Sequence, residues 1–335
     1  MKKKLLALVL AAAMAVALAA CGNSGAPAAS SAAASSGASS AAGKTYRVGI
    51  CQLVQHPALD AATQGFEAAL TDKLGSAVTF DLQNAQGDSP TCATICNQFV
   101  SDGVDLIMAN ATNALQAAAT ATDKIPVLGT SVTDYGTALG IKDWTGSTGT
   151  NVSGTSDLAP LDGQANMLNE LFPDAKNVGI LYCSAEANSV YQATTIEGYL
   201  TKMGYTCKEY TFSDSNDVQA VASNAAAASD VIYIPTDNTA ASNAELIKNV
   251  CVPAGIPIIA GEEGLCSGCG VATLSISYYD LGYETGEMAY DVLVNGKDPA
   301  TLPIQFAPKF TKEYNADLCK TLNVTVPSDY TAIGG

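Results

Sequence analysis

The chain is poor in positive charge and in the side chains that most often grip anions. Arg47 is the only arginine and His56 the only histidine among 335 residues, and 16 Lys and Arg stand against 32 Asp and Glu. Binding of nucleic acid or an anionic lipid surface needs clustered Lys and Arg, so the folded part is expected to bind neither. Because Arg47 opens the first predicted strand, a guanidinium clamp for a carboxylate or phosphate is also not expected.

Sequence signatures of catalysis and of cofactor binding are missing as well. The chain has no Gly-x-Ser-x-Gly elbow, no Walker loop and no dinucleotide fingerprint. Cys266 and Cys269 form one Cys-x-x-Cys pair, which could be a disulfide, but no second pair accompanies it to complete a zinc site. We therefore expect no enzyme, no cofactor and no metal.

The number of cysteines does not fit complete pairing into disulfides. Nine cysteines follow Cys21, and an odd number leaves at least one thiol unpaired. Cys51 and Cys183 lie inside apolar strands, where a small buried hydrophobic side chain is expected.

The N-terminus has the features of an export signal. Lys2-Lys3-Lys4 precede an apolar segment, Leu5 to Leu18, that is too short to span a bilayer, so residues 1–20 are predicted to be a signal peptide. Leu18-Ala19-Ala20-Cys21 resembles a bacterial lipobox, which implies a diacylglycerol on Cys21; the alternative is an ordinary signal peptide with an incidental cysteine. Residues 21–44 would then be the lipidated cysteine and a flexible Ala/Ser/Gly tether, holding the protein at the outer face of the cell membrane.

The most informative stretch is Asp230 to Thr239. An apolar run of strand formers ends at Pro235, and polar residues that can cap a helix follow. A strand that passes through a polar turn into a helix places hydroxyl, amide and free N–H groups at the carboxyl edge of a parallel sheet, where α/β proteins bind small ligands.

This pattern recurs along the chain. Asp105 to Asn113 has the same layout as the stretch above, Val48-Gly49-Ile50 recurs as Val178-Gly179-Ile180, and Ile125-Pro126-Val127 recurs as Ile256-Pro257-Ile258. These correspondences, at offsets between 125 and 131 positions, predict two similar α/β lobes, each a parallel sheet with helices on both faces.

A set of polar turns carries a family resemblance: Gln55 to Asp60, Gln83 to Asp88, Ser184 to Ser189, Pro235 to Thr239, Gly261 to Glu263 and Ser277 to Gly282. Together they resemble the solute-binding lipoproteins of ABC transporters, in the subgroup associated with tryptophan and tyrosine uptake. The resemblance implies a two-lobed type I periplasmic-binding-protein fold with three crossings between lobes. It places the N-terminal lobe at 45–156 plus 278–303 and the C-terminal lobe at 157–277 plus 304–335.

An amino acid ligand needs an acceptor for its ammonium, donors for its carboxylate and a slot for its side chain. Carboxylates on the predicted cleft loops are the candidate acceptors, with Asp237 first, and hydroxyls and amides beside helix starts are the candidate donors. Tyr135, Trp144 and Tyr182 are candidate stacking partners, although Tyr182 and Tyr233 favour the core. The predicted ligand-binding set is His56, Thr112, Ser131, Thr133, Asp134, Ser184, Glu186, Asn188, Asp237, Asn238 and Glu262.

The function expected from these features is that of a monomeric extracytoplasmic receptor. Its lobes would close on an aromatic amino acid and present it to an ABC permease and its ATPase. Two alternatives keep the same fold: an anchored sensing or adhesive receptor, and a binding protein for a sugar or another small polar solute.

Overall fold

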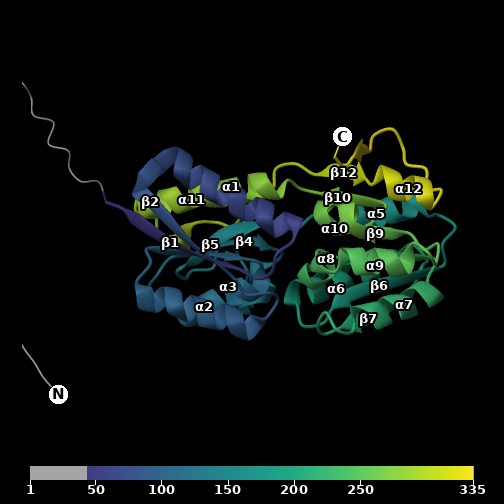
Figure 1. The fold of residues 1–335 in the computed structure, drawn as a ribbon, viewed down its shortest axis with the longest axis horizontal. Helices are drawn as coiled ribbons and strands as arrows, with labels where there is room; N and C mark the ends of the chain where they lie inside the picture. Colours follow the sequence, from purple (N-terminus) through teal and green to yellow (C-terminus); the bar gives the residue numbers. More distant parts are fainter. Residues whose placement is uncertain (1–43, 335) are drawn as a thin grey trace, which may run out of the picture. The chain divides into compact units, whose positions relative to one another are not determined.

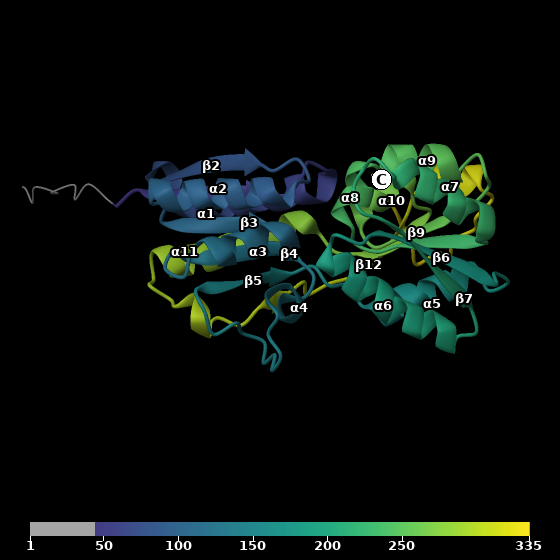
Figure 2. The ribbon, with the colours of Figure 1, turned by 90° about the horizontal axis from the view of Figure 1, so that it is seen from below.

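The computed structural model describes residues 44–334, which belong to one compact unit, Gly43–Gly335. These residues form two α/β lobes that lie side by side (Figures 1 and 2). The predicted signal peptide, the predicted lipidation at Cys21 and the tether up to residue 43 lie outside the described residues. Within 44–334, no helix combines the length and the apolar character needed to cross a bilayer.

The first lobe is built on a six-stranded parallel sheet in the order β11-β5-β4-β3-β1-β2. Helices α2 and α3 pack on one face, and α1 and α11 pack on the other, as predicted for a doubly covered sheet. The strands are β1 (Tyr46–Gln52), β2 (Val78–Asn84), β3 (Leu106–Asn110), β4 (Val127–Val132), β5 (Val152–Ser156) and β11 (Gln305–Phe306). The helices are α1 (Pro57–Leu74), the 3-10 turn η1 (Gly75–Ala77), α2 (Ser89–Asp102), α3 (Thr112–Ala121), α4 (Tyr135–Leu139), α11 (Tyr278–Leu293) and the 3-10 turn η2 (Pro299–Thr301).

The second lobe is built on a seven-stranded sheet in the order β13-β12-β10-β9-β8-β6-β7. The sheet departs from the predicted parallel arrangement at one edge: β12 pairs antiparallel with β10, and β13 pairs parallel with β12, so both run opposite to the other strands. The strands are β6 (Asn177–Cys183), β7 (Thr206–Phe212), β8 (Val231–Ile234), β9 (Ile258–Ala260), β10 (Ala272–Ser275), β12 (Thr311–Tyr314) and β13 (Thr331–Ala332). The helices are α5 (Leu161–Leu171), α6 (Ala187–Lys202), α7 (Val218–Ala228), α8 (Asn238–Ser242), α9 (Ala244–Cys251), α10 (Glu263–Cys269) and α12 (Ala316–Thr321).

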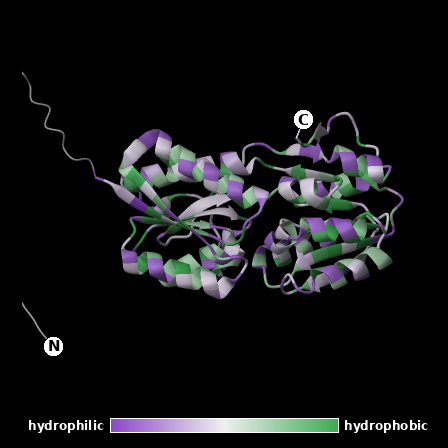
Figure 3. Ribbon diagram, in the orientation of Figure 1, coloured by the Kyte–Doolittle hydropathy of each residue, from purple (hydrophilic) through white to green (hydrophobic). Residues whose placement is uncertain are grey.

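Burial explains why these segments form sheets and helices. Every residue of β3, β4 and β8 is buried, so continuous apolar runs form the central strands, whereas the helices alternate hydrophilic and hydrophobic residues (Figure 3). Helices α1 and α11 approach closely because Gly65 and Gly282 lack side chains. A Cβ on Gly282 would lie 1.9 Å from the carbonyl oxygen of Ala62, so any larger residue there would force the two helices apart.

The chain crosses between the lobes three times: after β5, between β10 and α11, and between β11 and β12. From the sequence, the second and third of these crossings are expected at 277/278 and 303/304. One boundary changes: Gln305 and Phe306, assigned to the C-terminal lobe by the sequence, pair with β5 in the first sheet. The third crossing thus follows Phe306, and the other lobe boundaries stay our proposal.

Two short helices, one in each lobe, begin at carboxylate caps. The stretch after Thr133 begins with α4, whose first turn Asp134 caps, and the Gly- and Cys-rich stretch after Glu262 forms α10, which Glu262 caps. The polar turn after Pro235 leads into two helices, α8 and α9, that meet at Asn243.

Candidate functional site

The carboxyl ends of the central strands in both lobes face a common cleft, and two hydrogen bonds cross it. His56, which precedes α1, lies 3.2 Å from Asn238 on α8, measured between His56 Nε2 and Asn238 Oδ1. Gln192 on α6 donates from Nε2 to Thr133 Oγ1, at 3.2 Å. All four side chains are buried. The lobes therefore stand close enough to enclose a small molecule.

The first-lobe wall of the cleft, formed by the start of α3 and the end of β4, presents donors without a partner among residues 44–334. Helix α3 begins after Ala111, which has a positive φ of 95° and no side chain able to cap the helix, so the first N–H groups are left free. The hydroxyls of Thr112 and Ser131 beside them are buried, and neither has a hydrogen-bond partner among the described residues. Ser131 also has a positive φ, 55°, a strained conformation that often marks a functional position.

The second-lobe wall has the opposite character, and Glu186 shows it best. Its carboxylate accepts five hydrogen bonds: two each from Asn238 and Thr239 and one from Asn188. These donors include the first N–H groups of α8, so Glu186 caps that helix from a neighbouring loop. The sequence predicted Glu186 as a ligand contact, but its two oxygens are already occupied.

Asp237 and Glu262 are also helix caps. Asp237 accepts from Ala240 N at 2.7 Å and from Cys183 N at 2.6 Å, which ties α8 to β6. Glu262 accepts from the backbone N–H groups of Gly264 and Leu265. Burial raises the pKa of Asp237 to about 8, helped by the charge of Glu186, and raises the pKa of Glu262 to about 7.

A fourth buried carboxylate, Asp157, lies at the first crossing and was not predicted. It accepts two side-chain hydrogen bonds, from Thr133 Oγ1 at 3.1 Å and from Tyr278 OH at 3.0 Å. Burial raises its pKa to about 6, against an ordinary value of 3.8. Within residues 44–334, no Lys or Arg pairs with Asp157, Glu186, Asp237 or Glu262. Among them, Asp157 is the one that caps no helix.

Two further polar side chains at the cleft have an atom without a partner. His56 Nδ1 and Asn188 Oδ1 are both buried and make no hydrogen bond to any residue that the structure describes. Together with the hydroxyls of Thr112 and Ser131, they make four buried polar groups without a hydrogen-bond partner among the described residues, which we call idle. Three belong to the first lobe and one to the second. Buried polar groups are almost always paired in native proteins, so such a cluster points to a ligand.

The remaining predicted residues are placed elsewhere or serve their own lobe. Asp134 is half-buried and accepts from Thr137 N at 2.6 Å as the cap of α4. Ser184 is exposed and donates to the carbonyl oxygen of Phe212. The predicted stacking partners lie in the cores: Tyr135 stacks on Trp144 with ring centroids 6.5 Å apart, and Tyr182 belongs to a second-lobe core.

Two cavities between the lobes are lined in part by residues near His56 in the chain. One, of about 260 Å³, is lined by Val54 and Asn113 of the first lobe and by Glu186 and Asn238 of the second. The other, of about 320 Å³, is lined by Pro57 of the first lobe together with residues that include Glu262, Gly264 and Tyr278.

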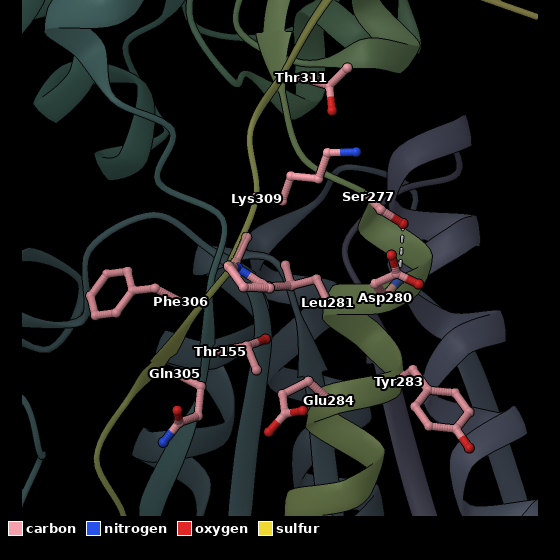
Figure 4. Close-up of a pocket in the computed structure, with 12 residues that line it drawn as sticks. Thr155, Ser277, Asp280, Leu281, Tyr283, Glu284, Gln305, Phe306, Lys309 and Thr311 are labelled. Atoms are coloured by element: carbon pink, nitrogen blue, oxygen red, sulfur yellow. Dashed lines mark hydrogen bonds between the residues drawn. The ribbon is translucent and has the colours of Figure 1, made fainter.

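A larger cavity, of about 590 Å³, lies at the crossings and shares no residue with the predicted site. Figure 4 shows Asp280 and Glu284 of α11 on one side and Phe306 and Lys309 on the other. These four side chains are exposed. Since they are hydrated, they offer a ligand less than the idle buried groups of the cleft, and we assign the site to the cleft.

The nine cysteines after Cys21 all lie within the described residues. All nine cysteines after Cys21 are free thiols, including Cys266 and Cys269, and Cys51 and Cys183 are buried as predicted. Residues 44–334 contain no cluster of His, Cys, Asp and Glu that could hold a metal ion.

Comparisons with known proteins fit this geometry. The model of the family described as "ABC transporter substrate binding protein" matches residues 47–332. A tyrosine-binding protein of Clostridioides difficile is 39% identical over 284 residues, which are 84% of this chain and 82% of that protein.

Two solved structures are informative because they differ in state. An ABC domain from Streptococcus pneumoniae in complex with L-Trp superposes with a TM-score of 0.81 at 31% identity, covering 85% of this chain and 97% of that one. The ligand-free, open structure of a Clostridium difficile substrate binding protein with adhesive properties has a TM-score of only 0.65 at 37% identity, covering 86% and 99%. The fold is the two-lobed type I periplasmic-binding-protein fold, and its lobe arrangement resembles the complex more than the open structure, although the open structure is nearer in sequence.

Proposed function

The chain belongs to the ABC transporter substrate binding proteins, and on that premise we propose that it binds an aromatic amino acid between its lobes and delivers it to a permease. Two relatives support the ligand class: one is named a tyrosine-binding protein and the other is a complex with L-Trp. Their ligands are both zwitterions with a flat side chain, and the cleft offers groups suited to each end of such a molecule.

The observation that carries the proposal is the cluster of idle donors on the first-lobe wall. A carboxylate placed there would accept from the free N–H groups at the start of α3 and from the hydroxyls of Thr112 and Ser131. It would also gain from the positive end of the helix dipole. This arrangement needs no arginine, which agrees with the single, distant Arg47, whose guanidinium donates to the carbonyl oxygen of Asp102.

The ligand ammonium has a matching partner in Asp157. Its carboxylate is buried at the first crossing, accepts from two neutral hydroxyls and has no cationic partner within the described residues. An ammonium would supply the missing charge and make a charge-assisted hydrogen bond. We therefore assign Asp157, in place of Asp237, Glu186 and Glu262, as the acceptor for the ammonium, with Tyr278 beside it.

Closure of the lobes would hold the ligand. The hydrogen bonds from His56 to Asn238 and from Gln192 to Thr133 exist only when the two walls meet. A ligand that contacts both walls stabilises that arrangement, because only the closed state satisfies all of its contacts. The better superposition on the L-Trp complex supports this view.

We further propose that the protein works as a monomer anchored outside the cell membrane through Cys21. The support is the sequence pattern Leu18 to Cys21, together with a family whose members bind solutes for import. The mass of the protein extracted from cells tests the anchor. A diacylglyceryl adduct on the first residue after cleavage is expected, and it should disappear in the Cys21→Ala variant.

The ligand is tested by a thermal-shift screen of the chain from residue 22 onward, which includes the whole compact unit Gly43–Gly335. The panel holds the twenty amino acids, common sugars and nucleosides. A ligand at a hundred times its Kd adds about 2.7 kcal/mol to the free energy of unfolding. A shift confined to tyrosine, tryptophan and phenylalanine supports the proposal. A shift with a sugar alone would refute the ligand class, and no shift at all would favour a sensing or adhesive role.

A further inference from the structure

We propose that His56 selects for a hydrogen-bond donor on the ligand's side chain, so that the cleft prefers the phenol of tyrosine or the indole of tryptophan to the bare ring of phenylalanine. This inference rests on the proposed function and adds a specificity-determining residue to it. It follows from the orientation of one amide, which fixes which nitrogen of the imidazole carries the proton.

The orientation of Asn238 is set by Glu186. Glu186 Oε2 accepts from the Asn238 side-chain Nδ2 at 2.6 Å and from the Asn238 backbone N at 3.1 Å. A carboxylate can only accept here, so the amide nitrogen must face it. The other side-chain atom of Asn238, the acceptor Oδ1, is therefore the one that faces His56.

The proton on His56 follows from this. Since Asn238 Oδ1 accepts, His56 Nε2 at 3.2 Å must donate and carries the hydrogen. Burial lowers the pKa of His56 and outweighs the opposing effects of Asn238, Glu186 and Asp60, so the ring is neutral near pH 7. In a neutral ring with a proton on Nε2, Nδ1 is a bare acceptor.

That acceptor is idle. His56 precedes α1, where a side chain often caps the helix, yet it makes no capping hydrogen bond, and Nδ1 has no partner. The side chain is 6% exposed. Two cavities between the lobes are lined in part by Val54 and by Pro57, which lie close to His56 in the chain.

The facing wall adds a second idle acceptor through the same carboxylate. Asn188 Nδ2 lies within hydrogen-bond distance of Glu186 Oε2 (3.1 Å), the carbonyl oxygen of Thr236 (3.0 Å) and Ser189 Oγ (3.2 Å). Asn188 Oδ1 is left as a buried acceptor without a partner. Glu186 thus orients acceptors on both sides of the cleft without touching the ligand itself.

A ligand side chain with one O–H or N–H can donate to one of these acceptors, which we assign as His56 Nδ1, whereas phenylalanine leaves both unpaired. Sites built to pair with a ligand donor discriminate strongly against the analogue that lacks it. One unpaired buried acceptor corresponds to about 10- to 100-fold in affinity. We therefore expect tyrosine and tryptophan to bind about 10- to 100-fold tighter than phenylalanine.

The proton position can be measured directly, because His56 is the only histidine in the chain. The protein from residue 22 onward, purified without a histidine tag and labelled with nitrogen-15, gives one pair of imidazole resonances. We expect the Nε2–H tautomer between pH 6 and 8, and a shift of the Nδ1 resonance on adding tyrosine but not on adding phenylalanine. A proton on Nδ1 in the free protein would overturn the inference.

Calorimetry with tyrosine, tryptophan and phenylalanine tests the selection. His56→Phe also removes the hydrogen bond to Asn238 and should weaken all three ligands, but it should weaken tyrosine and tryptophan about 10-fold more than phenylalanine. His56→Gln, which can offer an amide oxygen, should restore part of the preference. Equal binding of all three by the native protein, or an equal loss for all three in His56→Phe, would mean that Nδ1 meets the common part of the ligand and would overturn the selection. If none of the three amino acids binds, both the proposed ligand class and the proposed selectivity are wrong. If all three bind equally well, only the selectivity is wrong.

Discussion

On the first-lobe wall of the cleft the hydroxyls of Thr112 and Ser131 are buried without partners, whereas on the second-lobe wall Glu186 alone accepts five hydrogen bonds. Each wall includes a strand, a turn and a helix: β3 and α3 in the first lobe, and β8 and α8 in the second. They differ in how the first turn of the helix is satisfied: α8 is capped by Asp237 and Glu186, and α3 begins after an alanine.

The difference separates groups that hold the fold from groups that are free to bind. A carboxylate already surrounded by N–H donors stabilises its helix and has little left to offer a ligand. An uncapped helix start beside unpaired hydroxyls lowers the stability of the free protein. When an anion binds there, these N–H and O–H groups gain hydrogen bonds, which favours binding. Charge and position alone do not tell these cases apart, but hydrogen-bond partners do.

The largest effect that tests this comparison is expected at Glu186. Glu186→Ala leaves the starting N–H groups of α8 and the amides of Asn238 and Asn188 without their acceptor. We expect a loss of about 3 kcal/mol in the free energy of unfolding without any ligand, since several charge-assisted hydrogen bonds disappear together. Urea unfolding followed by circular dichroism measures it, with exposed Glu284→Ala as the control. A loss below about 1 kcal/mol would mean that Glu186 is not the cap we describe.

Asp157→Asn, unlike Glu186→Ala, should weaken ligand binding without lowering the stability of the free protein. Removing the charge that meets the ammonium should raise the Kd for tyrosine about 100-fold, as expected for a buried charge-assisted contact. The free protein should not be weakened, because the variant no longer buries an uncompensated charge. Calorimetry and urea unfolding measure the two effects. Binding unchanged by the substitution would remove Asp157 from the site.

The same variant has a pH signature. Burial raises the pKa of Asp157 to about 6 from 3.8, so the folded protein keeps a proton that the unfolded chain releases. Its contribution to stability is complete below about pH 4 and is lost as pH rises through 6. The native protein should therefore lose stability relative to Asp157→Asn between pH 4 and 7. A gap between the two that does not change with pH would contradict the assignment.

A smaller effect is expected on the first-lobe wall. Thr112→Val keeps the shape of the side chain and deletes the idle hydroxyl, so we expect the Kd for tyrosine to rise about 10-fold. The free energy of unfolding should stay the same or increase, because a buried unpaired group is removed. Calorimetry on this variant, with exposed Thr137→Val as the control, makes the test. Lower stability with unchanged affinity would show that Thr112 is structural.

Much of the fold could be predicted from the sequence, because the pattern of apolar residues indicates strands and helices and the internal repeat indicates two lobes. The offset of 125 to 131 positions between matching strands revealed two lobes, and the polar turns located the cleft edge. The sequence also named His56, Thr112 and Ser131, whose side chains have idle atoms in the cleft. What these positions share is a place at the end of a strand or at the start of a helix, which a linear pattern can show.

Roles within the cleft were harder to predict, for a physical reason. Asp237 ranked first because its turn is so well formed, but a well-formed turn is what a capping carboxylate produces. Asp157 was overlooked because it stands on a crossing, without a helix of its own, and its partners Thr133 and Tyr278 are 24 and 121 positions away. Whether a buried carboxylate is satisfied depends on such distant donors, and no local pattern reports them.

The smallest effect is expected at Asp134, the predicted site residue that the structure sets apart from the buried groups. Its carboxylate caps α4 through Thr137 N at 2.6 Å and is half-buried at the edge of the first lobe. Asp134→Ala should cost about 1 kcal/mol of stability, the usual value of such a cap, and leave the Kd for tyrosine within about twofold. Calorimetry should compare the Kd for tyrosine of this variant with that of Asp157→Asn. Asp134 follows β4 and Asp157 follows β5 of the same sheet, and we expect the first to cap a helix and the second to bind the ligand. A large loss of affinity in Asp134→Ala would move the ammonium site to the rim and undo the distinction between satisfied and idle groups.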